Sequence, residues 1–380
     1  MIIAHILSSF GLGGQERVAV DLARLQRASG HEVHALSIAR GPEGPSADAF
    51  RKFGVRVETI AKGPRIDLSL PIRLAAHLRR HHVAVVHTHN PHALIYGAPA
   101  ARLANAVAIH SKHGVNPDSA RRLWLRRLAA RFVDAYVAVT PTLAAVAAAK
   151  RDCPEARLHV ISNGIDVKRF APNRRARRDV RAELGIPEEA WVVGTVGRLA
   201  KEKNQGLLLQ AMAPLLGEDR RLVIVGDGEE GASLRATVSR MRQGAFVHML
   251  GSRDDVEDLL AAFDAFALTS LTEGLPLVLL EAMATGLPVI STAVGGIPDL
   301  IEHRITGFLS PSGEHGPLTR QLEWLSTDTS LSRQIGEAAR RDVLELYSVE
   351  RMARAYGALY ETSLAQRSPA SSRSVTAPSA

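Results

Sequence analysis

The 380-residue sequence predicts an α/β protein built from two Rossmann-like, doubly wound domains. Three observations predict this fold class. The chain is too long for one ordinary hydrophobic core, and 46% of its residues are hydrophobic, which is typical of a soluble globular protein. Short apolar runs also alternate with helical periodicity along nearly the whole chain, as in parallel strands joined by helices.

The first domain is expected over residues 1–168. The segments IIAHILS, ERVAVDLARLQRASG and HEVHALSI have the pattern of strand, helix and strand, and Gly30 is a helix stop before the second strand. Four more apolar runs, separated by Ala/Leu/Arg-rich helices, predict further strands: VRVETI, VAVVHTH, AVAIHSK and DAYVAVT.

The second domain is expected over residues 169–347, after a junction near 165–185. Its predicted strands are WVVGTVGR, RLVIVGDG, AFVHML, DAFALTS and LPVIST. A last helix at about 348–365 is expected to pack back on the first domain. The Ser/Pro/Ala-rich residues 366–380 lack apolar material and are expected to be disordered.

Composition limits the partners and the compartment. A net charge of +8 favours an anionic partner: nucleic acid, an anionic membrane surface or a phosphorylated small molecule. Aromatic residues are only 4% of the chain, which argues against a single-strand binder. The single cysteine, Cys153, suits a reducing compartment, and no apolar run reaches the roughly 18 residues of a membrane span. We expect a cytoplasmic protein that is at most peripheral to a membrane.

Glycines follow the first predicted strand. Gly11, Gly13 and Gly14 precede a helix, where backbone amides can approach an anion closely. Arg17 stands where the third glycine of a dinucleotide-binding fingerprint would be, so a dinucleotide cofactor is not expected. A plain tight turn is the alternative interpretation.

Basic residues follow the first strand of the second domain. Arg198 ends WVVGTVGR, and Lys201 and Lys203 lie in the next loop. A guanidinium and an ammonium at the carboxyl end of a strand suit a diphosphate. The alternative is a solvated basic loop.

The stretch LTEGLPLVLLEAMATGLPVI carries Glu273 and Glu281 around a predicted helix start at Pro276. Eight helical positions span roughly 12 Å, whereas a glycosidase pair lies about 5–9.5 Å apart. The spacing therefore favours one elongated ligand, such as a nucleotide sugar, over hydrolysis. Free amides of Gly274 and Leu275 would face its pyrophosphate. The alternatives are a buried helix glutamate at 281 and a helix-dipole partner at 273.

An ordered set of motifs runs along the chain. It comprises G-G-x-x-R at 13–17, S-N-G-I-D at 162–166, G-R-L-x-x-E-K at 197–203, G-D-G at 226–228, E-G-x-P-x-x-x-x-E at 273–281, G-G-x-P-D at 295–299 and Y-S-V-E-R at 347–351. This set resembles family 4 of the retaining glycosyltransferases, which have the GT-B fold. The resemblance implies sugar transfer from a nucleotide diphosphate sugar to an acceptor, with the anomeric configuration kept.

The resemblance also implies residue roles. Glu273 would hold donor-sugar hydroxyls and Glu281 the ribose, while Arg198 and Lys203 would neutralise the leaving diphosphate. Further donor contacts are implied at Gly13, Gly14, Gly274, Leu275 and Pro276.

His113 matches the active-site histidine of the resembled family, with His110 as a nearby competitor. It would lie near the donor sugar without acting as general base, since the leaving phosphate is thought to take the acceptor proton. No Asp-x-Asp motif occurs, so no metal and no cofactor beyond the donor are expected.

The acceptor side is expected around His89 and Asn90. The nearby segment DSARRLWLRRLAARF is an amphipathic helix that could lie on an anionic membrane. Packing of Leu123, Leu128 and Phe132 on its own sheet is the expected alternative, with weak membrane association arising from the net charge.

The expected function is retaining transfer of a sugar to a saccharide or lipid-linked acceptor, in cell-surface polysaccharide or glycolipid synthesis. Two alternatives remain open. Another GT-B enzyme, such as an epimerase, would share the diphosphate site, and a non-catalytic nucleic-acid-binding protein would use only the basic surface.

Overall fold

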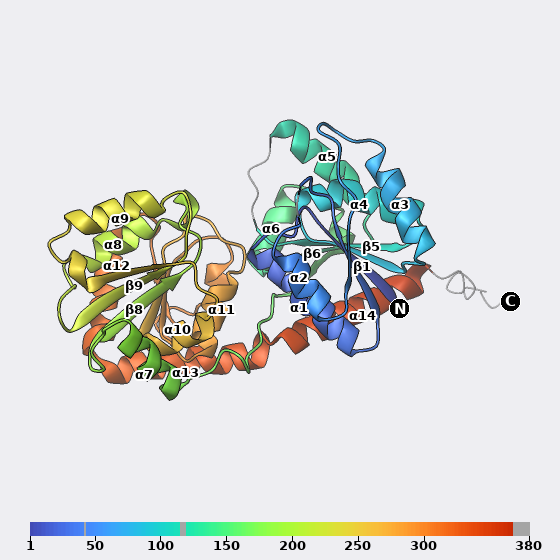
Figure 1. The fold of residues 1–380 in the computed structure, drawn as a ribbon. Helices are drawn as coiled ribbons and strands as arrows, with labels where there is room; N and C mark the ends of the chain where they lie inside the picture. Colours follow the sequence, from blue (N-terminus) through green and yellow to red (C-terminus); the bar gives the residue numbers. More distant parts are fainter. Residues whose placement is uncertain (42, 115–118, 368–380) are drawn as a thin grey trace. The chain divides into compact units, whose positions relative to one another are not determined.

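A computed structural model describes residues 1–41, 43–114 and 119–367 and divides the chain into two compact units. Unit 1 contains residues 1–163 and the chain from Val349 onward, and unit 2 contains residues 164–348 (Figure 1). The first boundary thus lies five residues before the predicted 168/169. Most of the tail predicted to be disordered, residues 368–380, lies outside the described residues.

Unit 1 is built on a seven-stranded parallel sheet with the order β3-β2-β1-β4-β5-β6-β7. Its strands are β1 (Ile2–Leu7), β2 (Glu32–Ser37), β3 (Arg56–Thr59), β4 (Val85–Thr88), β5 (Val107–Lys112), β6 (Ala135–Ala138) and β7 (Leu158–Val160). The first six are those predicted from the apolar runs. The edge strand β7 was not predicted, because three residues form too short a run to show periodicity.

Helices cover both faces of this sheet (Figure 1). The helices of unit 1 are α1 (Gly14–Ala28), α2 (Ser46–Lys52), α3 (Leu70–Arg80), α4 (Pro91–Leu103), α5 (Ala120–Ala130), α6 (Pro141–Ala149), the short 3₁₀ helix η1 (Glu155–Arg157) and α14 (Val349–Arg367). On one face α1 packs against α2 and α14, and on the other α4 packs against α3 and α5.

Helix α14 comes from the far end of the chain but completes the core of unit 1. Tyr356 and Tyr360 are buried, and both hydroxyls bond to polar side chains of the sheet. Arg367 also pairs with Asp134, next to β6. The last described helix is therefore part of the first unit's structure.

Unit 2 has a six-stranded parallel sheet with the order β10-β9-β8-β11-β12-β13. Its strands are β8 (Trp191–Val196), β9 (Arg220–Val225), β10 (Val247–Gly251), β11 (Ala265–Leu268), β12 (Val289–Thr292) and β13 (Phe308–Ser310). Five were predicted, and the three-residue β13 was not. The two parallel sheets confirm the predicted fold class.

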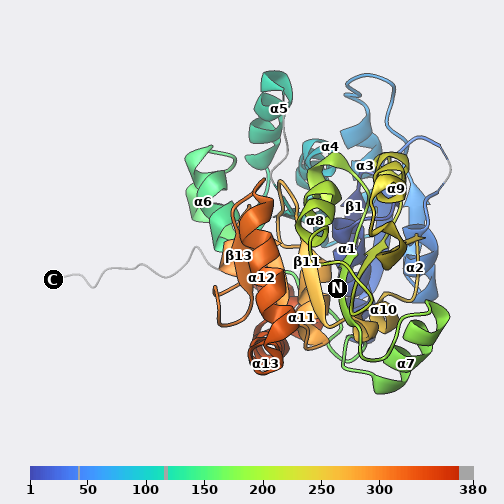
Figure 2. The ribbon, with the colours of Figure 1, turned by 90° about the vertical axis from the view of Figure 1, so that its left-hand side faces the viewer.

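The helices of unit 2 also form two layers. They are α7 (Arg174–Glu183), α8 (Gln205–Met212), α9 (Gly231–Arg240), α10 (Val256–Ala262), α11 (Leu277–Ala284), α12 (His315–Thr327) and α13 (Thr329–Leu346), with 3₁₀ turns η2 (Lys201–Lys203), η3 (Gly244–Phe246) and η4 (Ile297–Asp299). Helices α8 and α12 lie side by side (Figure 2), whereas α7 packs on α10 and α13 on α11.

A buried arginine fixes α7 to its sheet. Arg181 donates to the carbonyls of Ala262, Glu188 and Ala190 at 2.7–2.9 Å and to Asp264 at 2.6 Å. Asp264 also accepts from the amide of Val192 at 2.7 Å. Because its donors are shared among these acceptors, the guanidinium can be buried at the start of β8.

Both sheets reverse their strand order once. The reversal lies between β1 and β4 in unit 1 and between β8 and β11 in unit 2. In open parallel sheets, ligands bind outside the carboxyl ends of the strands at such a switch point. The loops that follow these four strands are therefore the first place to look for a site.

The orientation of α5 corrects one prediction. Leu128 and Phe132, expected to pack on the sheet, are exposed, while Arg126 points inward. Asp152 is completely buried and explains this, because it accepts from Arg126 at 2.9 Å and from Lys112 at 2.8 Å. The ion pair turns Arg126 toward the sheet and leaves Leu128 facing outward.

Burial alone would raise the pKa of Asp152, but the hydrogen bonds and charges of Lys112 and Arg126 outweigh it and lower the pKa. The carboxylate is therefore ionised at neutral pH. Its stabilising contribution is present above the pKa of an unfolded aspartate and is lost as the pH falls through the lower folded value.

Replacing Asp152 by Asn should destabilise unit 1 strongly. The substitution removes the carboxylate with which two buried cations pair, and breaking a buried pair costs about 3–5 kcal/mol. Urea denaturation followed by circular dichroism would measure the loss.

The matched control is Asp48→Asn, which breaks an ion pair with Arg51 whose aspartate side chain is 86% exposed. We expect almost no change there, since exposed pairs contribute about 0–1 kcal/mol. Equal midpoints for the two variants would contradict the structural role of Asp152.

Candidate functional site

The switch point of unit 2 holds an ion pair between two predicted site residues. Lys203, in η2 after β8, places Nζ 2.5 Å from Oε1 of Glu273, in the loop after β11. Ser270 donates to the same oxygen at 2.6 Å. The side chains of Lys203 and Glu273 are 25% and 9% exposed. The pair is therefore largely buried but still accessible to a ligand.

Three loops hold this pair in place. Leu271 donates from its amide to the carbonyl of Glu202 at 2.8 Å, which joins the β11 loop to η2. Thr292, at the end of β12, donates to the carbonyl of Ser270 at 2.6 Å. Gly295 has φ of +57°, and a Cβ there would lie 1.8 Å from the Glu273 carbonyl oxygen. The glycine of the G-G-x-P-D motif thus permits this close approach.

The G-D-G motif has a similar packing role. A Cβ at Gly226 would lie 1.9 Å from the Gly197 carbonyl oxygen, and one at Gly228 would lie 2.3 Å from that of Leu199. The β9 loop therefore packs directly against the β8 loop that carries the basic residues.

Arg198 and Lys203 have different carboxylate partners. Arg198 is 62% exposed and pairs with Glu202, whereas Lys203 pairs with Glu273. Both residues therefore lie on the β8 loop, but they pair with different carboxylates. The diphosphate role of each stays a prediction.

The segment around Glu281 differs from the sequence-based expectation. Helix α11 begins at Leu277 with Pro276 as its N-cap, so Gly274 and Leu275 precede the helix and are not its first amides. The 12 Å estimate assumed a continuous helix and does not apply. Glu281 lies in α11 with a buried side chain.

At the switch point of unit 1, Gly13 is the N-cap of α1 and Gly14 its first residue, and both are exposed. Glu16 lies in the first turn, and a Cβ on Gly13 would be 2.4 Å from its Oε2. Gln15 donates to Glu16 Oε1 at 2.9 Å. A carboxylate therefore already lies at this helix start, where the macrodipole stabilises negative charge.

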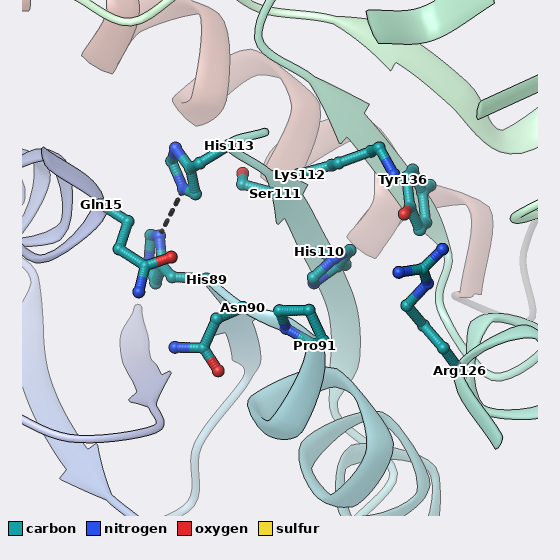
Figure 3. A pocket seen from close by; sticks show the side chains of 10 residues that line it. All are labelled: Gln15, His89, Asn90, Pro91, His110, Ser111, Lys112, His113, Arg126 and Tyr136. Carbon is teal, nitrogen blue, oxygen red and sulfur yellow. Dashed lines mark hydrogen bonds between the residues drawn. The ribbon is translucent and has the colours of Figure 1, made fainter. Parts of the chain in front are cut away.

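A chain of buried side chains leads to His113, and Figure 3 draws its last link, between His89 and His113. Its Nε2 lies 3.4 Å from Nδ1 of His89. His89 Nε2 lies 2.8 Å from Nδ1 of His5, and His5 Nε2 lies 2.8 Å from the amide oxygen of Gln26. Three elements supply the chain: β1 carries His5, α1 carries Gln26, and His89 follows β4.

The direction of this chain follows from Gln26. An amide oxygen only accepts, so His5 donates from Nε2, and a neutral imidazole has a single N–H. His5 Nδ1 must then accept from His89, and His89 Nδ1 must accept from His113. The Nδ1 atom of His113 is left as the acceptor of that ring.

A second branch follows the same logic. The Gln26 amide nitrogen donates to the Tyr360 hydroxyl at 3.4 Å, and Tyr360 lies 2.7 Å from His87 Nδ1. His87 Nε2 lies 2.7 Å from the Ser111 hydroxyl, which contacts Tyr356 at 2.7 Å. Helix α14 thus supplies two hydroxyl groups that satisfy the histidines of the sheet.

These histidines are neutral at physiological pH. Burial lowers the pKa of His5 to about 4, against the opposing effect of its hydrogen bond to Gln26. Burial also lowers the pKa of His113 to about 4, against the effect of Asn163, and those of His87 and His89 fall well below the ordinary value. As the pH falls below about 6.5, the unfolded chain takes up protons that the folded network does not, so stability declines.

The other residues near His113 have distinct surroundings (Figure 3). His110 is buried, bonds to Thr88 at 2.9 Å and packs on Tyr136. Asn90 caps α4 by accepting from Ala93 at 3.0 Å, and Ser8 donates to it. His110 is thus a packing histidine, while His113 is only half-buried.

The side chains of His89, Asn90 and His113 line a pocket of about 10 Å³, roughly the space of one water molecule. Lys112 and Arg126 lie on its wall, and both pair with Asp152.

The ring nitrogens of His5, His87 and His89 lie within the spacing of a metal site. Both nitrogens of His5 and of His87 are hydrogen-bonded, however, and so are those of His89. The hydrogen-bond network therefore accounts for the burial of these rings, and the residues fit it better than a metal.

Several residues of this network were not predicted. His5 and His87 stand inside apolar strands, which was a usable signal, because a buried polar side chain requires a partner. Gln26, Tyr356 and Tyr360 carry no such signal, since they lie on amphipathic helices far away in sequence.

Comparison with known proteins finds one matching family model in each half of the chain. A family model described as glycosyl transferases group 1 matches residues 176–342, and one described as glycosyltransferase family 4 matches residues 12–169. The chain belongs to the group 1 glycosyltransferases with the GT-B fold, as the motif set predicted. It is a glycosyltransferase.

Two relatives match most of the chain. N-acetyl-alpha-D-glucosaminyl L-malate synthase of Bacillus anthracis is 29% identical over 362 residues, which covers 92% of this chain and 94% of the relative. The UDP-Gal:alpha-D-GlcNAc-diphosphoundecaprenol alpha-1,3-galactosyltransferase of Escherichia coli is 30% identical over 324 residues, covering 81% and 83%.

Among solved structures, Anabaena HepE in complex with UDP-glucose is similar in fold, with a TM-score of 0.86 and 24% identity. The match covers 95% of this chain and all of that one. In the part of the chain that the structure describes, no helix is long and apolar enough to span a bilayer.

Replacing Gln26 by Leu should disturb the tautomer of His113. The change removes the acceptor that orients His5, and a buried donor left unpaired costs about 1–3 kcal/mol. Long-range ¹⁵N–¹H NMR of histidine-labelled protein would show a larger fraction of His113 with its proton on Nδ1.

Gln26→Glu is the matched control, because its carboxylate keeps an acceptor opposite His5 Nε2. It should keep the tautomer of the unmodified protein. If the leucine and glutamate variants gave the same His113 spectrum, the orienting role of Gln26 would be wrong.

Proposed function

We propose that this glycosyltransferase transfers a sugar from a nucleotide diphosphate sugar to a saccharide or lipid-linked acceptor, with retention of the anomeric configuration. The observation that carries the proposal is the Lys203–Glu273 pair at the switch point of unit 2. It places a cation and a hydrogen-bond acceptor together, in a family that moves sugars.

Glu273 is proposed to hold hydroxyls of the donor sugar. Both Lys203 and Ser270 contact its Oε1, so within the described residues Oε2 is the oxygen better placed to accept from a ligand. Glu281 is proposed for the ribose hydroxyls. Because the Glu281 side chain is buried, this contact requires either a local rearrangement of the chain or a ribose that inserts deeply beside α11.

Lys203 and Arg198 are proposed to stabilise the leaving diphosphate. The bond from the anomeric carbon to the β-phosphate oxygen breaks as negative charge develops on that oxygen, and a preorganised cation stabilises the charge. Arg198, being exposed, can leave Glu202 at little cost, because exposed pairs are weak. Backbone amides at Gly13, Gly14, Gly274 and Leu275, with Pro276 shaping the loop, would complete the donor contacts.

The acceptor oxygen would bond to the same face of the anomeric carbon, and its proton would pass to the leaving phosphate oxygen. A neutral His113 suits hydrogen bonding to the donor sugar better than proton abstraction, since its pKa of about 4 makes it a weak base at pH 7. His89 and Asn90 are proposed for the acceptor side. The reaction as proposed needs no metal and no cofactor besides the donor.

The names of the relatives support this substrate class. The Escherichia coli relative is named for a UDP-Gal donor and a diphosphoundecaprenol-linked acceptor. A comparable role here would fit cell-surface polysaccharide or glycolipid synthesis in the cytoplasm, at the inner face of the plasma membrane.

Helix α5 supports membrane association more than the sequence suggested. Trp124 and Leu128 are 62% and 39% exposed, and their spacing of four residues places them on one face of α5. Phe132, just beyond the end of the helix, is 38% exposed. Arg121 and Arg127 are exposed beside them. An apolar stripe among arginines suits the surface of an anionic bilayer.

The function is tested by titrating the full chain with a panel of nucleotide diphosphate sugars and following its melting temperature. The cognate donor should raise the Tm, because a ligand that binds only the folded state stabilises it by mass action. No response to any donor, in a protein shown to be folded, would overturn the proposal.

Replacing Lys203 by Ala should lower kcat by about 10²-fold or more, since removing one preorganised charge partner costs that much in other enzymes. Donor binding should weaken far less. Turnover of the cognate donor, measured by release of nucleoside diphosphate, gives the comparison.

Lys201→Ala is the control, because Lys201 is an exposed neighbour in the same 3₁₀ turn. It should retain normal turnover. A second variant, Glu281→Gln, should weaken nucleoside diphosphate binding if Glu281 holds the ribose, and unchanged affinity would remove that role.

Replacing Trp124 and Leu128 together by Ser should reduce binding to vesicles that contain anionic phospholipid. The variant loses apolar area that would enter the headgroup region, while Arg126 and Asp152 still hold α5 in place. Sedimentation with vesicles of phosphatidylglycerol and phosphatidylethanolamine measures the bound fraction.

Ile72→Ser is the control, because Ile72 on α3 is 64% exposed and lies outside the arginine-rich helix. Its vesicle binding should match that of the unmodified protein. Equal losses in both variants, or none in either, would argue against α5 as the membrane-binding element.

A further inference from the structure

A cluster of histidine and glutamate side chains lies away from the switch point of unit 1, at the edge strand β3 of the sheet. His77 and His81 are contributed by the last turn and the C-cap of α3, and Glu58 by the edge strand β3. His34, on the adjacent β2, packs on both imidazole rings, with ring centroids 5.8 and 5.0 Å away.

The spacing of these groups is that of metal ligands. Glu58, His77 and His81 each offer one ligand atom within 4.8 Å of the other two. The Nδ1 of His77 lies 3.4 Å from the Oε2 of Glu58, and two ligands on one tetrahedral Zn²⁺, each about 2.0–2.1 Å from the ion, lie about 3.3 Å apart. One pair already has this separation.

Local structure explains why the three groups meet. Residues four apart on a helix share a face, and the rings of His77 and His81 lie 4.5 Å apart between centroids. Glu58, on β3, lies beside this face of α3, since its Oε2 is 3.4 Å from the Nδ1 of His77. His77 is buried and Glu58 partly exposed, so an ion could enter from solvent and find a fixed ligand.

We propose that His77, His81 and Glu58 form a site for a divalent transition metal, with Zn²⁺ as the best match. Two imidazoles and one carboxylate suit zinc, and the fourth position would be taken by water. The His34 ring, which packs on the rings of His77 and His81, would help to hold both ligands in place. Nothing in the proposed sugar transfer uses these residues.

Charged side chains around the cluster would compete with a metal for its ligands. Arg56 donates to Oε1 of Glu58 at 2.7 Å and lies 3.4 Å from Nδ1 of His81. Glu32 faces His34 at 3.0 Å, and Arg80 lies near enough to affect His81. The side chain of Arg56 is 54% exposed, so it can turn into solvent when the metal takes Glu58.

The metal would link the edge strand β3 to α3, which the His77–Glu58 contact already joins. The expected effect is therefore on stability. The Tm of the metal-loaded protein should be higher than that of the EDTA-treated protein.

The test uses the full chain, freed of metal with EDTA and dialysed, then titrated with ZnCl₂ by calorimetry and thermal melting. The unmodified protein should bind zinc at this site with a rise in Tm. Loss of a second-shell partner alone costs about 10–100-fold in metal affinity, so His81→Gln should weaken zinc binding at least tenfold and remove the rise in Tm. Arg56→Ala should strengthen binding, since it removes both a like charge and the competitor for Glu58.

His82→Asn is the matched control. His82 is exposed, adjacent to the cluster and outside it, and its φ of +49° suits asparagine. It should bind zinc as the unmodified protein does. Absence of zinc binding in the unmodified protein, or equal binding by the His81 variant with a normal metal-free melt, would overturn the site.

Discussion

The reversal of strand order in each sheet is the constraint on which the rest of this molecule depends. At that point neighbouring loops diverge to opposite faces, and the carboxyl ends of the strands are left open. In unit 2 the reversal between β8 and β11 brings Lys203 and Glu273 together across 70 residues of sequence. In unit 1 the reversal between β1 and β4 brings Gly13 and Asn90 to the same edge.

The two units stabilise the partly or fully buried polar groups at this edge in different ways. Unit 2 uses a partly exposed ion pair, whose charges remain available to a charged ligand. Unit 1 uses neutral imidazoles, because burial keeps them uncharged and hydrogen bonds satisfy both nitrogens of His5. The neutral, directional network of unit 1 orients the ring of His113 without adding charge, whereas unit 2 keeps the cation of Lys203 partly exposed.

Sequence reasoning found what is encoded locally. Long apolar runs predicted eleven of the strands, and the motif set pointed to the family. It missed β7 and β13, whose three residues leave no periodicity. It misjudged α5, because the residue that sets its orientation, Asp152, lies 26 positions from Arg126. Tyr360, one of the two polar partners of His87, lies still farther away in sequence, on α14. Neither the Asp152 pair nor the Tyr360 contact could be inferred from spacing.

The same long-range pairing keeps three features of unit 1 independent of one another. Asp152 turns Arg126 of α5 toward the sheet, so that Trp124 and Leu128 face outward, Gln26 orients the histidines beside the switch point, and Glu58 lies on the edge strand β3. None of these three acids or amides shares a hydrogen-bond partner with another in the described chain. Effects at such independent sites are expected to add, so a change in membrane binding, histidine tautomer or metal affinity can be assigned to one of them.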